Sequence, residues 1–166
     1  DYLGGKIAYI LQAGDPGYDA SVPHGLIAAT KDQSLEIVWI SGGSTQSTSV
    51  PGGTGTALGT GSSNTDNIIA QAVAAGNNTL TSYAAGLARA HNGGGYNDWY
   101  LPSKDELNKL YLNRVAIGGF ANDYYWSSSE YDASSHSHAW FQHFGNAYQD
   151  GDFKYATRRV RAVRAF

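Results

Sequence analysis

Cysteine and methionine are both missing from this chain of 166 residues. The absence of cysteine excludes disulfides, thiolate metal ligands and a cysteine nucleophile. The absence of methionine leads us to expect a processed protein or an excised domain, with any signal or anchor outside this sequence. The longest apolar run is far shorter than the roughly 18 residues of a membrane span, so we expect no membrane insertion by this segment.

Charged residues are scarce as well, since Asp, Glu, Lys and Arg make up only 15% of the chain. The net charge of −3 argues against a nucleic-acid partner. Glycine and tyrosine are abundant, with 21 and 12 copies. Gly, Ser, Asn and Tyr together are typical of loop-rich β proteins and also of binding loops such as antibody paratopes. The length fits one domain over 1–166.

Hydrophobic patterns predict strands at both ends of the chain and helices between them. Short apolar runs indicate strands over 6–11, 25–29, 35–40, 124–130, 139–144 and 159–166. Apolar residues at helical spacing indicate helices over 63–76 and 80–91, and a third helix follows the capping box of Ser103 and Glu106. Because helices and strands are grouped rather than alternating, this order predicts an α+β fold.

The first of these helices has predicted ends. Ser63 is a suitable cap with Asp66 in the first turn, and Gly76 is a suitable stop. The preceding Gly-, Ser- and Thr-rich stretch over 41–63 is expected to be an ordered long loop, because Leu58 lies inside it.

The C-terminal residues 154–166 contain five basic residues and no acid. Such a segment could bind phosphate or sulfate. It could also be a terminal strand whose arginines pair with acids elsewhere in the domain. Val160, Ala162 and Val163 interleave with the arginines as in a packed strand, so the second interpretation is favoured.

Few side chains suggest chemistry. His136 and His138 would share one face of a strand and could hold zinc or copper. The acids Glu130, Asp132, Asp150 and Asp152 could bind calcium or act as acid and base. Neither group has a motif's spacing, and no nucleophile or phosphate-loop motif is present. We therefore expect no enzyme, no metal and no cofactor, and leave open a structural calcium ion that no motif supports.

Four segments in order carry a resemblance to a known family: NDWYLPSKDELN at 97–108, YWSSSE at 125–130, AW at 139–140 and RVRAVRAF at 159–166. Together they resemble the C-terminal domain family of collagen-like bacterial adhesins, and the start of the chain fits it too. The resemblance implies a C-type-lectin-like domain with central helices, a C-terminal antiparallel sheet and long loops.

This sequence departs from related proteins in informative ways. Family members often carry a cysteine in the helix that corresponds to 84–91, and here there is none. Formylglycine-generating enzymes share the broader fold, but their reactive cysteines or bound copper have no counterpart here. Calcium-dependent lectins carry a Glu-Pro-Asn or Gln-Pro-Asp loop, and no proline here has those neighbours.

Residues 131–158 also resemble the variable region of proteins that retroelements diversify. In such systems mutated asparagine codons never yield Trp, Gln, Lys, Glu or Met. Fixed positions would then be Trp140, Gln142, Gln149 and Lys154. The variable positions would be Phe141, His143, Gly145, Tyr148, Asp150, Gly151, Asp152, Phe153, Tyr155, Ala156 and Arg158.

The resemblance implies a non-catalytic receptor or adhesin domain that binds a ligand through this region. Trp126, Trp140, Phe144 and the 159–166 strand would form a rigid base, with Phe141 and His143 on the opposite side of their strand from Trp140. The expected ligand-binding residues are Tyr131, Asp132, Ser134, His136, His138, Phe141, His143, Asn146, Tyr148, Asp150, Asp152, Phe153, Tyr155 and Arg158.

The implied partner is a protein or glycan ligand on another cell or surface. The domain would be extracellular, on a cell surface or phage virion, and oligomerisation stays open. One alternative is a fixed-specificity adhesin that binds sulfated polysaccharide through the basic residues between Arg158 and Arg164. Another is a structural trimerisation or capping domain for a fibrous stalk.

Overall fold

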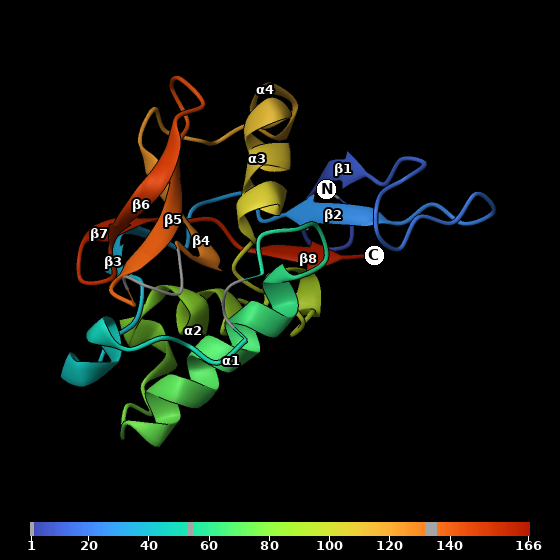
Figure 1. Cartoon of the computed structure of the whole chain (residues 1–166). Coiled ribbons are helices and arrows are strands. Elements are labelled where there is room, and N and C mark those ends of the chain that lie inside the picture. The colour runs from blue at the N-terminus through green and yellow to red at the C-terminus, as the bar shows by residue number, and fades with distance from the viewer. Residues whose placement is uncertain (1, 53–54, 132–135) are drawn as a thin grey trace.

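Eight strands build two sheets in the computed structural model, which describes residues 2–52, 55–131 and 136–166 (Figure 1). The smaller sheet has the order β1-β2-β8, with the bounds Lys6–Ile10, Gly25–Ala28 and Val163–Ala165. The larger sheet has the order β3-β7-β4-β5-β6. In chain order its strands are Ser34–Val38, Tyr124–Glu130, His138–His143, Gln149–Phe153 and Thr157–Val160.

The helices come from the middle of the chain, and α3 stands between the two sheets (Figure 1). The α-helices are α1 (Gly61–Ala74), α2 (Ala84–Arg89), α3 (Lys104–Leu112) and α4 (Arg114–Ile117). Short 3-10 helices span Gly43–Ser47, Leu80–Ser82 and Gly93–Gly95. The α+β fold predicted from the sequence is confirmed. None of the helices in the described ranges has the length and apolar character to cross a membrane.

The capping box at Ser103 is confirmed. The Ser103 hydroxyl accepts the Glu106 N–H at 3.3 Å, and the Glu106 carboxylate accepts the Ser103 N–H at 2.7 Å. The predicted start of the first helix at Ser63 is wrong, because α1 begins at Gly61. A Cβ at Gly61 would lie 2.1 Å from the Glu106 carboxylate, so close packing against α3, and not a side-chain cap, decides where α1 begins.

The helix predicted over 80–91 is divided in the structure. Tyr83 adopts the extended values φ −153° and ψ 160° between a 3-10 helix and α2, and its side chain is fully buried. Burial of this ring in the core therefore overrides the local helical pattern.

The end predicted for the first helix is confirmed, since Gly76 follows α1 with φ +84°.

The single strand predicted over 159–166 is also wrong, because the chain crosses there from one sheet to the other. β7 ends at Val160 and β8 begins at Val163. Between them Arg161 is buried, where its guanidinium pairs with Asp32 and donates to the Ala29 carbonyl at 3.0 Å. Partners distant in sequence, which a local pattern cannot reveal, fix this crossing.

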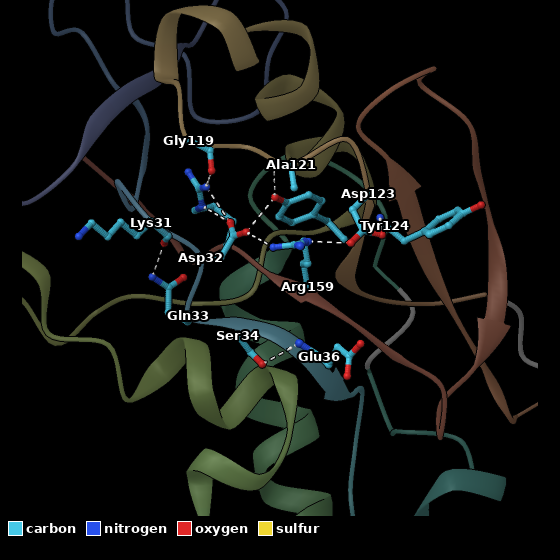
Figure 2. A network of polar contacts seen from close by, with 12 residues as sticks. Lys31, Asp32, Gln33, Ser34, Glu36, Gly119, Ala121, Asp123, Tyr124 and Arg159 are labelled. Atoms are coloured by element: carbon cyan, nitrogen blue, oxygen red, sulfur yellow. Dashed lines mark hydrogen bonds and ion pairs between the residues drawn. The ribbon is translucent and has the colours of Figure 1, made fainter.

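A polar network around Asp32 fastens the ends of the two sheets together (Figure 2). The Asp32 carboxylate accepts from the Tyr125 hydroxyl at 2.9 Å and from the Arg159 guanidinium at 3.2 Å. Arg159 also donates to Asp123 at 2.8 Å. Asp32 thus accepts hydrogen bonds from Tyr125, Arg159 and Arg161. Because opposite charges are paired, this network stabilises the domain and presents little charge to solvent.

Candidate ligand-binding face

The segment predicted to bind a ligand forms the β5–β6 hairpin, and β6 is the free edge of the larger sheet (Figure 1). The register sets Phe141 opposite Asp150 and Ala139 opposite Asp152. Because side chains alternate across a strand, these residues share one surface. We call it the Arg158 face, made of Tyr124, Phe141, His143, Tyr148, Asp150, Asp152 and Arg158.

Arg158 lies at the centre of that face. Its guanidinium carbon stands 4.9 Å from the ring centroid of Tyr124 and 5.7 Å from that of Phe141. It forms an ion pair with Asp152, and its Nη1 donates to the Thr157 carbonyl at 2.9 Å. About a quarter of the side chain is exposed, at 26%. The arginine is therefore held in place by its neighbours while one side remains open to a ligand.

Phe141 does not project into solvent, and this part of the prediction is wrong. Only 7% of Phe141 is exposed, and it belongs to the core cluster that contains Trp126. The ring of Tyr124 stands edge-on to it at 5.2 Å, and the Arg158–Asp152 pair lies over it. Phe141 is thus the floor of the Arg158 face and not an anchor for a ligand.

The opposite surface of the hairpin carries a second aromatic group. We call it the Trp140 face, made of Tyr131, His138, Trp140, Phe153 and Tyr155. Trp140 was expected in a sealed base, but it is only partly buried, with the Lys104 ammonium 4.4 Å above its ring. Alternation along β5 accounts for this, since Trp140 lies on the opposite surface from Phe141.

Three other aromatic residues that are expected to bind the ligand are exposed. Tyr148 is 51% exposed, Phe153 42% and Tyr155 58%. The rings of Phe153 and Tyr155 stack at 4.9 Å with an interplanar angle of 13°. An exposed aromatic pair that is already ordered loses little conformational freedom when it binds a partner.

The remaining predicted residues lie around these two faces. His136 and Asn146 are exposed, and Asn146 accepts the Tyr148 N–H at 3.1 Å in the hairpin turn. His143 is partly buried, with its ring 4.6 Å from that of Tyr124. Asp132 and Ser134 lie outside the described residues. In the described ranges, no three His, Cys, Asp or Glu side chains come close enough to hold a metal ion.

The N–H groups at the free edge of β6 bind side chains of the same strand. The backbone N–H of Lys154 donates to the Ser137 carbonyl, so the N–H groups of even-numbered residues point toward β5. Those of odd-numbered residues point outward. The outward N–H groups of Gly151 and Phe153 are each bound at 2.8 Å by the preceding aspartate. Asp150 and Asp152 therefore satisfy the donors that an edge strand would otherwise expose.

A buried ion pair fixes the C-terminal end of the hairpin to the end of β4, and no motif in the sequence indicates this pair. Lys154 donates to Glu130 and, at 2.8 Å, to the Thr48 carbonyl, and neither charged side chain has any exposure. The Lys154 ammonium is also 4.9 Å from the Trp39 ring centroid. Burial lowers the pKa of Lys154, while the bond to Glu130 opposes that shift.

The basic tail is neutralised within the domain, as the favoured interpretation predicts. Arg164 binds both oxygens of Asp98, at 2.7 and 2.8 Å. Arg159 pairs with Asp123 and Asp32, as Figure 2 shows. With Arg158, Arg161 and Lys154 also paired, each of the five basic side chains has a carboxylate partner.

Comparison with known proteins gives one family. A search of the curated proteins finds no match. The family model described as the Lcl C-terminal domain matches residues 28–164. This range contains all four helices and the whole β5–β6 hairpin. The chain therefore belongs to the Lcl C-terminal domain family.

Proposed function

We propose that this chain is a non-catalytic binding domain whose β5–β6 hairpin holds a ligand displayed on another cell or surface. The observation that carries the proposal is the exposure of Tyr148, Phe153 and Tyr155 on a hairpin whose C-terminal end is fixed by a buried ion pair. Large, ordered, exposed aromatic side chains are typical of protein-binding surfaces. A protein is therefore the favoured ligand, with a glycan as the alternative.

We further propose that the hairpin is diversified by a retroelement. The fixed positions of that hypothesis tie the hairpin to the rest of the domain: Gln142 donates to Asn108 at 2.9 Å, and Gln149 to the Lys104 carbonyl at 3.1 Å. Lys154, also fixed, is fully buried. Of the eleven positions expected to vary, Gly145, Tyr148, Phe153 and Tyr155 are exposed, six are partly buried and Phe141 is buried. This division supports a surface whose residues change while its support stays constant.

The rival function is a fixed adhesin that binds sulfated polysaccharide through the basic tail. Internal pairing of its five basic residues weakens that alternative, because a polyanion would have to displace a carboxylate from each. Salt separates the two functions. Polyanion binding should collapse by about 0.5 M NaCl, whereas an aromatic protein contact should largely survive.

Two display libraries test the proposed function. One randomises the exposed positions Tyr148, Phe153 and Tyr155, and the other randomises the fixed positions Gln142, Gln149 and Lys154. We expect the first library to stay folded and to yield binders against several unrelated proteins, and the second to lose folded members. Equal loss of folding in both libraries would refute the division between support and surface.

The retroelement part has its own test. Sequencing the gene's neighbourhood should find a reverse transcriptase and an adenine-rich near-copy of codons 132–158. Finding neither would leave a binding domain of fixed specificity.

A further inference from the structure

Acids in this domain repeatedly share a cation with an aromatic ring. Arg164 binds Asp98 while its guanidinium carbon lies 3.8 Å from the ring centroid of Tyr96. The buried pair of Lys154 and Glu130 repeats the arrangement, with the ring of Trp39 as the aromatic member. In each case the carboxylate supplies the charge and the ring covers the cation.

The same arrangement recurs with partly exposed groups on the Arg158 face, where Arg158 binds Asp152 over the ring of Tyr124. A related group lies near the N-terminus, where the Tyr9 hydroxyl donates to Asp15 at 2.6 Å and the Lys109 ammonium lies 4.2 Å from the Tyr9 ring centroid. Among the described residues, carboxylates next to aromatic rings therefore repeatedly attract a basic side chain.

Asp150 has the carboxylate and a ring without the cation. It accepts hydrogen bonds from the Tyr148 hydroxyl and the Gly151 N–H. In the part of the chain that the structure describes, no Lys or Arg forms an ion pair with it. The bond from Tyr148, followed by that from Gly151, lowers the pKa of Asp150, so it is ionised at neutral pH.

Tyr148 leaves this carboxylate open to a partner, since its side chain is 51% exposed. Asp150 and Asp152 lie on the same surface of β6, about 7 Å apart as alternate residues of a strand. Since Asp152 is already neutralised by Arg158, Asp150 carries the unbalanced negative charge of the Arg158 face.

We propose that Asp150 and Tyr148 form a site for a lysine or arginine side chain of the partner protein. The inference rests on the proposed function of the hairpin and specifies the chemistry of its ligand. A guanidinium is the better fit, because its planar face can stack on a tyrosine while its N–H groups reach the carboxylate. The ion pair of Arg158 with Asp152 over the Tyr124 ring, on the same face, is an example of such contacts within this domain.

L-argininamide, added to the whole chain, is the probe. We expect saturable shifts of the Tyr148, Asp150 and Gly151 amide signals in two-dimensional NMR, and little response to the uncharged analogue L-citrullinamide. Asp150→Asn should weaken argininamide binding by about tenfold or more, since it removes the charge and keeps the shape. Tyr148→Ala should weaken binding by a smaller factor because the carboxylate remains.

The matched control is Asp105→Asn, which makes the same charge change at an exposed residue of α3. It should leave probe binding unchanged. Equal affinity in wild type and Asp150→Asn, equal loss in Asp105→Asn, or equal binding of citrullinamide would overturn the inference. If the exposed-position library still yielded protein binders, the proposed function would survive without this site.

Discussion

Two sets of residues share the β5–β6 hairpin but have opposite surroundings. Gln142 and Lys154 have no exposed surface and bond to other parts of the domain. Tyr148 and Tyr155 lie on the same hairpin and are more than half exposed, at 51% and 58%. Under the proposed function, folding and recognition would depend on different residues of one short segment. The exposed set could then change without loss of the buried set.

The largest expected effect is the loss of the buried cation. Lys154→Met leaves Glu130 buried without its charge partner and should lower the free energy of unfolding by about 3–5 kcal/mol. Urea denaturation followed by circular dichroism measures it. The double variant with Glu130→Leu should recover most of the loss, because no charge then remains buried. A single variant as stable as wild type would contradict the anchoring role.

Phe141 should behave as a support residue although it belongs to the expected variable set. Phe141→Ala removes a ring that is 7% exposed and should cost about 3 kcal/mol by cavity formation. The same denaturation experiment checks it. A loss in the free energy of unfolding below about 0.5 kcal/mol would mean that Phe141 is not a support residue.

Acid should lower the stability of the domain by protonating Asp98, the partner of Arg164. The hydrogen bond from Arg164 lowers the pKa of this carboxyl from its ordinary value of 3.8. A lowered pKa in the folded state means that the stabilisation is complete above about pH 4 and is lost as the pH falls through the folded-state value. The effect is modest because the Asp98 side chain is 52% exposed. Melting temperatures between pH 2 and 6 should be less pH-dependent in Asp98→Asn than in wild type.

The smallest effect on stability belongs to the exposed aromatic residues. Tyr155→Ala should change the free energy of unfolding by less than about 0.5 kcal/mol, because its ring contacts little besides Phe153. Binding of any ligand selected on the wild-type hairpin should nevertheless weaken by about tenfold or more. A large loss of stability with unchanged binding would reverse the assignment of this residue.

The sequence predicts those helices and strands whose formation depends mainly on neighbouring residues. The capping box at Ser103 and the strand Tyr124–Glu130 were both identified from the sequence. β6 was missed because Asp150, Gly151 and Asp152 lack an apolar alternation, and pairing with β5 makes the strand. Such pairing depends on a register that no single segment encodes.

The candidate site divides in the same way. Exposure of Tyr148 and Tyr155 follows from residue type and position in a polar, glycine-containing stretch. Burial of Phe141 depends on an arginine that returns over it from β7, which the sequence of β5 alone does not contain. Where exposure or burial depends on tertiary contacts, as at Phe141, the local sequence does not predict it.

The aspartates that bind their own strand's amides have a consequence for crowded surfaces. Copies displayed side by side would bring free strand edges into frequent contact, and unpaired amides there invite sheet-to-sheet joining. Asp150 and Asp152 occupy those amides, and the unpaired charge of Asp150 repels an identical edge. Densely packed copies of this domain can therefore remain separate molecules.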